Sequence, residues 1–237
     1  VINTGATPVQ LGIPGLAGNP KVYTSESLMD EPVLPKRLTL IGAGYIGMEF
    51  ASMYTNFGAK VTVMEGGDIF LPREDRDVAE AIYEIMTRRG VNIVMGAKIE
   101  KIEGSMVYYE DNGEKKKVEG DAILAATGRR PNTDDLDAEK AGVALTPRGA
   151  VQVDELLRTT APNIWAAGDV NGGLQFTFVS LDDYRVILSQ LTGGSRSRED
   201  RKNVPYSVFM DTPLARVGLS EKEAADQGLP VRILKLP

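Results

Sequence analysis

The stretch of residues 37–67 constrains the fold more than any other part of the chain. Leu38, Leu40 and Ile41 form an apolar run next to Thr39, which fits a buried parallel strand. Gly42, Gly44 and Gly47 follow it in the pattern G-x-G-x-x-G. In a dinucleotide-binding βαβ unit the first glycine permits a tight turn, the second lets a phosphate approach the backbone, and the third lets the helix pack close to the strand. The motif therefore predicts a site for a dinucleotide pyrophosphate.

The residues after the glycines complete this unit. Apolar residues recur at three- and four-residue steps across residues 45–57, which predicts a helix, and Gly58 suits its end. Residues 60–64, K-V-T-V-M, alternate and are rich in β-branched side chains, so they predict a second strand. The N-terminus of the helix attracts an anion through its unpaired N–H groups and its dipole. Glycines that serve packing alone, or a methyltransferase-like site, are the alternatives; the third glycine and the complete spacing favour the dinucleotide.

Glu65 stands at the end of the second predicted strand, 23 residues after Gly42. A carboxylate at this place can accept hydrogen bonds from the adenosine ribose and would repel a 2′-phosphate. No arginine occurs between Glu65 and Arg73, although an NADP site usually has a cation near that phosphate. We therefore expect NAD(H) in preference to NADP(H). The alternative is an ordinary strand-end carboxylate.

Composition narrows the chemistry that this chain can perform. Its net charge of −6 gives no support to nucleic acid or an anionic membrane surface as a partner. It contains no cysteine and no histidine, so disulfides, thiol chemistry, the usual zinc sites and histidine general-base catalysis are excluded within these residues. We therefore expect no metal site and no catalytic residue in this segment.

The remaining pattern predicts an α/β fold, in which a Rossmann-like domain carries an inserted antiparallel β-meander. Asn112-Gly113 is a strong hairpin signal within the meander, and Ser220 with Glu223 fits a capping box. Predicted helices cover residues 24–29, 73–90, 136–142, 176–191 and 220–228. Predicted strands cover residues 91–94, 98–102, 106–110, 115–118, 121–126, 151–153, 164–167, 206–217 and 231–236.

Five motifs carry a resemblance to a known family. They are T-G-A-T-P at residues 4–8, I-G-A-G-Y-I-G-M-E-F-A at 41–51, A-T-G-R-R-P-N at 126–132, I-W-A-A-G-D-V at 164–170, and T-P-L-A-R-V-G-L-S-E-K-E-A at 212–224. In this order the chain resembles the middle and rear of the pyridine nucleotide–disulfide oxidoreductases, the group of lipoamide dehydrogenase, glutathione reductase and mercuric reductase. The motifs are similar to its first A-T-G crossover, its NAD(P) motif, its second crossover, its flavin-ribityl motif and the opening of its dimerisation domain.

Residues 176–185 look closest to the reactive-chlorine-resistance flavoproteins within that family, some of which are thought to reduce metal ions such as copper. The resemblance also implies two sets of binding residues. The NAD(H) set is Gly42, Gly44, Tyr45, Ile46, Gly47, Glu49, Glu65 and Gly128. The FAD set is Thr4, Gly5, Gly168, Asp169, Phe176 and Thr177.

The family resemblance gives several of these residues a specific role. Tyr45 would cover the nicotinamide pocket until NADH displaces it, and Glu49 would reach toward the carboxamide or a flavin-side lysine. Asp169 would accept a hydrogen bond from a ribityl hydroxyl, and the helix that begins at Phe176-Thr177 would direct its dipole at the flavin. The alternatives are a surface aromatic, a solvated carboxylate and a turn aspartate.

Three parts of the family pattern are absent from this sequence: the first G-x-G-x-x-G, the redox cysteine pair and the C-terminal His-Glu pair. We therefore expect a piece of a longer, homodimeric, cytoplasmic flavoenzyme, inactive alone and retaining little FAD. Residues 1–31 and 150–202 would belong to a partial FAD-binding domain. Residues 32–149 would form the NAD(P)-binding domain, and residues 203–237 the start of the dimerisation domain.

The leading functional hypothesis is a flavin-dependent oxidoreductase. NAD(P)H would pass a hydride to FAD, which would then reduce a disulfide, a metal ion or another acceptor. The alternatives are a non-catalytic NAD(H)-sensing module, which would explain the missing cysteines and histidines, and an NADH oxidase-like flavoprotein. Gly168-Asp169 and residues 212–224 argue against a sensor, because a sensor does not need them. The expected partners are small dinucleotides, with no nucleic acid and no membrane.

Overall fold

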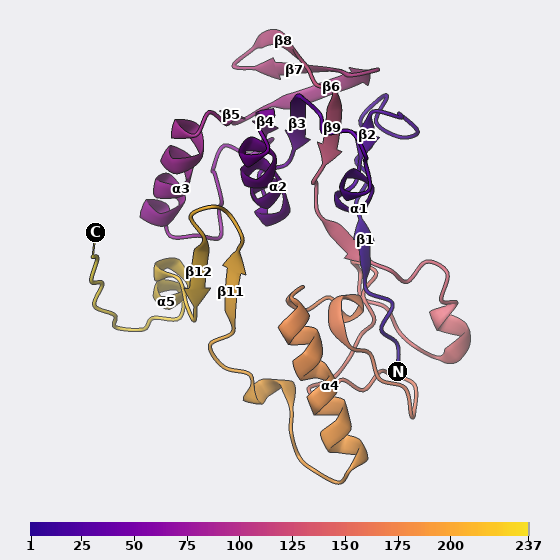
Figure 1. The fold of residues 1–237 in the computed structure, drawn as a ribbon. Helices are drawn as coiled ribbons and strands as arrows, with labels where there is room; N and C mark the ends of the chain where they lie inside the picture. The colour runs from indigo at the N-terminus through magenta and orange to yellow at the C-terminus, as the bar shows by residue number, and fades with distance from the viewer. Residues whose placement is uncertain (237) are drawn as a thin grey trace. The chain divides into compact units, whose positions relative to one another are not determined.

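The computed structural model describes residues 1–236, and the chain divides into two compact units. Unit 1 comprises Val1–Val9 and Arg129–Val204, and unit 2 comprises Gln10–Gly128 together with the chain from Pro205 onward. Each unit thus joins segments that are far apart in the sequence, as the colours of Figure 1 show. The four-part domain division stays a prediction about the longer protein.

Unit 2 is built on a parallel sheet of five strands in the order β2-β9-β3-β4-β5. The strands are β2 (Val22–Tyr23), β9 (Ala122–Ala125), β3 (Arg37–Ile41), β4 (Lys60–Met64) and β5 (Asn92–Val94). β9 is buried along its whole length and β3 over its last four residues. Because both faces of these strands are covered, β9 is apolar throughout, and β3 is apolar from Leu38 except for the buried Thr39. The predicted Rossmann-like α/β fold is confirmed.

Three helices pack on one face of this sheet. They are α1 (Ser25–Met29), α2 (Tyr45–Asn56) and α3 (Arg76–Arg88). Met48 and Tyr54 of α2 and Ile82 of α3 share one hydrophobic core with Leu40 and Val63 of the sheet. Of the apolar residues that predicted α2, Phe50 and Tyr54 are buried, Ile46 and Met53 are partly buried and Phe57 is exposed, so the buried side is centred nearer Met48 and Ala51.

α3 begins at Arg76, three residues later than the sequence predicted. Asp75 is its N-cap, and the residues before it form a turn in which Leu71 has a φ of 42°. The guanidinium of Arg76 donates to three backbone carbonyl oxygens of this turn, those of Phe70, Leu71 and Glu74. The turn is thus a fixed loop, and the helical pattern does not extend into it.

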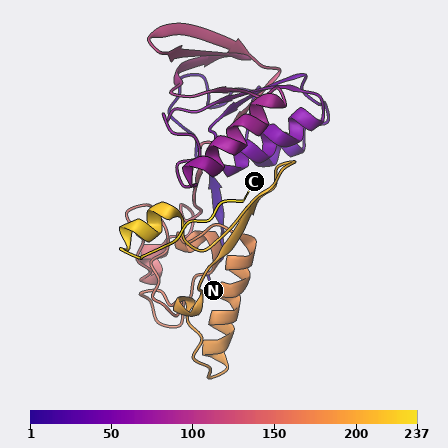
Figure 2. The same cartoon turned by 90° about the vertical axis from the view of Figure 1, so that its left-hand side faces the viewer.

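An antiparallel meander packs on the other face of the sheet (Figure 2). Its strands are β6 (Lys98–Glu103), β7 (Met106–Asp111) and β8 (Glu114–Glu119). Val107 and Tyr109 share a second core with Ile41 of the sheet. Asn112 and Gly113 have φ values of 51° and 82°, as a type I′ hairpin turn requires. The predicted meander is confirmed.

The last elements of unit 2 are β11 (Pro205–Val208), β12 (Leu214–Val217) and α5 (Glu221–Asp226). Residues 205–217 form the C-terminal hairpin, and Val208 and Leu214 enter the core that contains α2 and α3. The predicted capping box at Ser220 and Glu223 is present. The predicted strand at residues 231–236 is wrong, since these described residues pair with no strand. Alternating apolar and polar residues give a segment one apolar and one polar face, but a stable strand also needs a neighbouring strand to which it is hydrogen-bonded.

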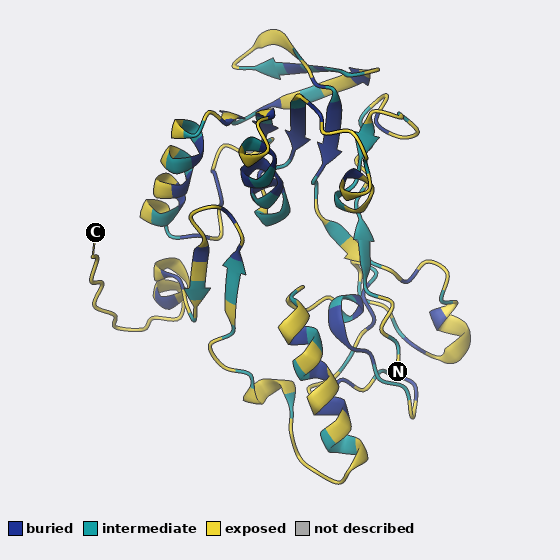
Figure 3. Cartoon of the chain, in the orientation of Figure 1, coloured by how far each residue is buried: buried dark blue, intermediate teal, exposed yellow. Residues whose placement is uncertain are grey.

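Unit 1 holds the first predicted crossover and residues 129–132 of the second, and these two segments pair with each other. β1 (Ala6–Pro8) runs antiparallel to β10 (Arg129–Pro131). The single long helix of this described unit is α4 (Thr177–Leu191), which is buried along one side and exposed along the other (Figure 3). Short 3-10 turns lie at Ala138–Ala141, Gly168–Asn171 and Arg198–Asp200.

The predicted strands at residues 151–153 and 164–167 are wrong. Both segments form isolated bridges, among them Val153 with Thr159 and Arg158 with Trp165. Their apolar residues still fill the core of unit 1, in which Val151 and Ala166 are fully buried. The apolar residues of these segments therefore predicted correctly that they are buried. They did not predict the secondary structure, because the segments lack the hydrogen-bonded ladder that defines a strand.

Candidate functional site

The first and third glycines of the motif are required by the backbone of unit 2 itself. Gly42 has a φ of +104°, and a Cβ there would lie 2.4 Å from the carbonyl oxygen of Ala126. A Cβ on Gly47 would lie 2.1 Å from the carbonyl oxygen of Gly42. These glycines allow β3, β9 and the start of α2 to approach closely, as the sequence motif predicts.

Gly44 behaves differently from its two neighbours in the motif. It is the N-cap of α2 with a φ of −69°, which any residue can adopt. No described atom outside its chain neighbours lies within 4 Å of a Cβ built there. Open space in front of the N-terminus of a 12-residue helix is what an approaching phosphate needs. The geometry therefore fits a pyrophosphate at this turn.

Glu65 lies across the same turn because β3 and β4 pair side by side, with Ile41 opposite Met64. Its Oε2 accepts a hydrogen bond from the backbone N–H of Ala43 at 2.8 Å, and its Oε1 accepts one from the N–H of Gly67 at 2.8 Å. The two bonds orient the carboxylate beside the turn. Each oxygen keeps further acceptor capacity, so a ribose hydroxyl could still donate to it.

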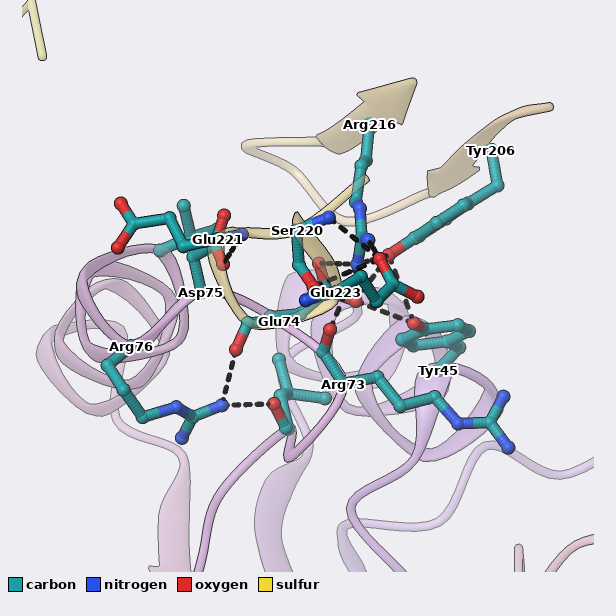
Figure 4. A network of polar contacts seen from close by, with 12 residues as sticks. Tyr45, Arg73, Glu74, Asp75, Arg76, Tyr206, Arg216, Ser220, Glu221 and Glu223 are labelled. Carbon is teal, nitrogen blue, oxygen red and sulfur yellow. Dashed lines mark hydrogen bonds and ion pairs between the residues drawn. The ribbon is translucent and has the colours of Figure 1, made fainter. Parts of the chain in front are cut away.

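Tyr45 and Glu49 lie on one side of α2, and both contact the C-terminal hairpin. The hydroxyl of Tyr45 donates to Oε1 of Glu74 at 2.6 Å and lies 3.2 Å from the hydroxyl of Tyr206 (Figure 4). Oε1 of Glu49 accepts from the backbone N–H of Phe209 at 2.9 Å. Burial, and then the hydrogen bond to Glu74, raises the pKa of Tyr45, so its hydroxyl stays a donor at neutral pH.

The other two residues of the NAD(H) set lie close to the turn. Ile46 packs against the core beside Tyr45. Gly128 follows β9 with a φ of +111°, and no described atom beyond its neighbours lies within 4 Å of a Cβ built there. The complete set thus follows the carboxyl ends of β3, β4 and β9, which is where open parallel sheets bind ligands.

The FAD set lies in unit 1 and was predicted separately. Thr4 donates through Oγ1 to the carbonyl oxygen of Asn132 at 2.7 Å, and the N–H of Asn132 donates to the carbonyl oxygen of Gly5 at 2.9 Å. Phe176 is the N-cap of α4, and Thr177 is the first helical residue. The first crossover, residues 129–132 of the second and the start of α4 are therefore ordered parts of one unit.

Gly168 and Asp169 begin a 3-10 turn that a buried carboxylate supports. The N–H of Gly168 donates to Oδ2 of Asp183 at 2.8 Å, and Asn171 donates to the same oxygen at 3.0 Å. Arg201 pairs with the other oxygen of Asp183. Burial raises the pKa of Asp169, while the charge of Arg129 opposes that rise.

Sequence reasoning missed Glu74, Tyr206 and Asp183, which hold these sites together. Glu74 and Tyr206 meet Tyr45 from 29 and 161 residues away, and Asp183 meets Gly168 from 15 residues away. The sequence offered one local signal, the pair Asp182-Asp183 on a predicted helix. One of two neighbouring carboxylates must lie near the apolar side of that helix, where a buried charge needs a partner.

The structure of residues 1–236 also bears on metal binding and on membrane insertion. No group of three or more histidine, cysteine, aspartate or glutamate side chains there could hold a metal ion. None of the helices in this part of the chain combines the length and apolar character needed to cross a bilayer.

Known proteins resemble this chain over its whole length. The family model described as pyridine nucleotide-disulphide oxidoreductase matches residues 1–183. The probable pyridine nucleotide-disulfide oxidoreductase RclA of Escherichia coli (strain K12) is 50% identical over 237 residues, which are 100% of this chain and 54% of that protein. The mercuric reductase of Staphylococcus aureus is 36% identical over 241 residues, which cover 100% of this chain and 44% of that protein.

A solved structure agrees with the sequence relationship. It is the Cu(II) complex of the HOCl-induced flavoprotein disulfide reductase RclA from Escherichia coli, with a TM-score of 0.89 and 50% identity, covering 95% of this chain and 52% of that chain. The chain therefore spans about half the length of the curated relatives it matches. With the family model, the relatives and the fold in agreement, the chain belongs to the pyridine nucleotide-disulphide oxidoreductase family.

Proposed function

We propose that unit 2 binds NADH and is the entry point for the pyridine nucleotide in a flavin-dependent oxidoreductase. The observation that carries this proposal is the open turn at Gly44, bordered by the oriented carboxylate of Glu65. NADH would supply a hydride, and FAD in the longer protein would accept it. This chain's own residues would hold the pyrophosphate at the turn, the adenosine ribose at Glu65 and the nicotinamide beside Tyr45 and Glu49.

The proposal extends to FAD in unit 1. Thr4, Gly5, Gly168, Asp169, Phe176 and Thr177 would contact the flavin nucleotide in the longer protein. The raised pKa of Asp169 is compatible with a partly buried carboxyl group that meets a ribityl hydroxyl. The electron acceptor would be a disulfide or a metal ion, since the relatives include a disulfide reductase, its Cu(II) complex and a mercuric reductase. Dimerisation through residues 203–237, and a cytoplasmic location, are proposals about that longer protein.

Purification of the 237-residue chain tests which of the two cofactors, NADH or FAD, this chain binds by itself. We expect it to bind NADH in a fluorescence titration and to carry little FAD. The reason is that the family's first G-x-G-x-x-G motif, which would bind the FAD adenosine, is absent from this sequence. Absorbance of the purified protein measures the flavin content. A stoichiometric yellow flavin band would contradict this prediction, and failure to bind NADH would contradict the proposed function.

Glu65 tests the choice of nucleotide. Glu65→Gln should weaken NADH binding about tenfold, or ~1.4 kcal/mol, because it removes a charged acceptor and turns an amide group toward one of the two N–H donors. Glu65→Arg should weaken NADH further and improve NADPH binding, because the new cation would face the 2′-phosphate.

The matched control for Glu65 is Glu100→Gln, which makes the same change at an exposed position of β6 in unit 2. It should leave both titrations unchanged. Equal discrimination between NADH and NADPH in all three variants would remove Glu65 from the nucleotide site.

A further inference from the structure

One buried carboxylate oxygen serves two tyrosines that come from different parts of unit 2. Oε1 of Glu74 accepts a hydrogen bond from the hydroxyl of Tyr45 at 2.6 Å and another from the hydroxyl of Tyr206 (Figure 4). The two rings are stacked, with centroids 5.5 Å apart. Tyr45 is the first residue of α2, beside the open turn, and Tyr206 lies on β11 of the C-terminal hairpin.

The position of Glu74 is fixed by its surroundings. Its side chain is 2% exposed, and it lies in the loop that the Arg76 guanidinium braces before α3. Nη1 of Arg216 on β12 is 3.9 Å from Oε2 of Glu74, at the outer limit of an ion pair. The same guanidinium donates to the carbonyl oxygen of Arg73 at 2.9 Å and pairs with Glu223. Arg216 therefore interacts with several acceptors, and the two tyrosine hydroxyls lie closer to the carboxylate of Glu74 than Arg216 does.

A buried carboxylate that loses its donors is costly, because burial removes the water that would replace them. Burial, followed by the hydrogen bond to Glu74, raises the pKa of Tyr45, and the same two causes act first on Tyr206. Both phenols therefore stay protonated at neutral pH and both can donate. If one of them moves away, the other can keep the carboxylate satisfied.

The same side of α2 carries further contacts to the hairpin, which keep Tyr206 in place. Oε1 of Glu49 accepts from the N–H of Phe209 at 2.9 Å. Oγ of Ser52 accepts from the N–H of Asp211 at 2.9 Å, and Asn56 donates to the Asp211 side chain at 3.3 Å. Residues 45, 49, 52 and 56 follow helical spacing along one stripe. The hairpin does not depend on Tyr45 for its docking.

We propose that Glu74 is a positioning residue that holds Tyr45 over the nucleotide site, and that Tyr206 is the reserve donor that satisfies Glu74 when Tyr45 moves aside. This rests on the proposed function and on the role that the family resemblance implies for Tyr45, whose ring NADH would displace. The hairpin thereby lowers the cost of opening the site, although it contributes no atom to the turn at Gly44. Affinity for NADH then depends on two residues outside the glycine motif.

The two residues should change NADH affinity in opposite directions. Glu74→Gln replaces a charged acceptor by a neutral one, so it should release Tyr45 and lower the Kd for NADH about fivefold, at the lower end of usual couplings between sites. Tyr206→Phe removes the reserve donor, so displacement of Tyr45 would strip Glu74 of both phenols and the Kd should rise about fivefold. The double variant should match Glu74→Gln alone, because Tyr206 acts through Glu74.

Tyr108→Phe is the matched control, since it removes a tyrosine hydroxyl from β7 of the same unit, and it should leave the Kd unchanged. A merely structural role for the network predicts weaker NADH binding in both Glu74→Gln and Tyr206→Phe, and that result would overturn the proposal. Equal affinity in all variants would overturn it as well.

A measurement without nucleotide separates this inference from the proposed function. The melting temperature is compared among the wild type, Tyr45→Phe, Tyr206→Phe and the double variant. Because either phenol can satisfy Glu74, the loss in the double variant should exceed the sum of the single losses. Additive losses would overturn the shared acceptor whether or not NADH binds. Absence of NADH binding by the wild type would contradict the proposed function and the gating role, while the melting cycle would still decide the shared acceptor.

Discussion

Gly44→Ala should weaken NADH binding about 100-fold, ~2.8 kcal/mol, while the melting temperature stays within about 2 °C of the wild type. Gly44 has a φ of −69°, and no described atom beyond its neighbours lies within 4 Å of the new methyl group. At an N-cap glycine costs only a few tenths of a kcal/mol relative to Ser or Asn and alanine about 1 kcal/mol, so this change should cost about 0.7 kcal/mol, or about 2 °C. The methyl group would therefore occupy only the space that the phosphate needs.

Gly47→Ala, in contrast, should act mainly by lowering the stability of the fold. Its Cβ would lie 2.1 Å from the carbonyl oxygen of Gly42, so the backbone of the turn or of α2 must shift. Overpacking of this kind costs about 3 kcal/mol, which lowers the melting temperature of a chain of this size by roughly 6–12 °C. Thermal melting and an NADH titration on both variants separate the packing glycine from the ligand glycine.

Gly12→Ala is the control for this pair. Gly12 lies in unit 2 away from the turn, and no described atom beyond its chain neighbours lies within 4 Å of a Cβ built there. It should change neither the melting temperature nor NADH binding. Unchanged NADH affinity in Gly44→Ala would show that the phosphate lies elsewhere.

The different outcomes of the sequence predictions have a physical cause. The βαβ unit could be predicted because its information is local: the turn, the cap and the alternation lie within about 30 residues, the usual size of such a unit. The antiparallel meander was equally local, with Asn112-Gly113 as its turn signal. Conversely, the short strands at residues 151–153 and 164–167 failed because pairing partners are set by tertiary packing, which an apolar run does not encode.

The candidate site shows the same division between local and distant information. Glu65 could be placed beside Gly42 because consecutive parallel strands of a βαβ unit pair with each other. Glu74 and Tyr206 could not, because nothing in their own segments marks them. Glu74 is buried and Tyr206 half-buried only where the hairpin packs beside α2. Residues that support a site from other segments are therefore found by packing, and motifs alone miss them.

Asp183→Ala should destabilise unit 1 by about 3–5 kcal/mol, the usual cost of removing one partner from a buried charged network. The side chain of Asp183 is 2% exposed and accepts from the Gly168 N–H, from Asn171 and from Arg201. Without it, an N–H, an amide and a guanidinium lose their acceptor together. The turn at Gly168 and Asp169 should then loosen, and with it the proposed contact to the flavin.

The chain supplies its own probe and its own control for this prediction. Trp165 is the one tryptophan of the sequence and lies three residues before Gly168 in unit 1, so its fluorescence during urea denaturation reports on this region. Asp182→Ala makes the same chemical change at the adjacent residue. Asp182 pairs with Arg196 and Arg201 and has a side chain 13% exposed, and no hydrogen bond joins it to the Gly168 turn in the described residues.

Asp182→Ala should cost less, about 1–2 kcal/mol, because its partner Arg196 is half-exposed and Arg201 keeps its pair with Asp183. Equal losses in the two variants would locate the stability in the arginine pairs and not in the support of the turn. A large loss in Asp183→Ala alone would instead identify this buried carboxylate as the residue that fixes the Gly168 turn, because the two variants remove the same charge and share Arg201.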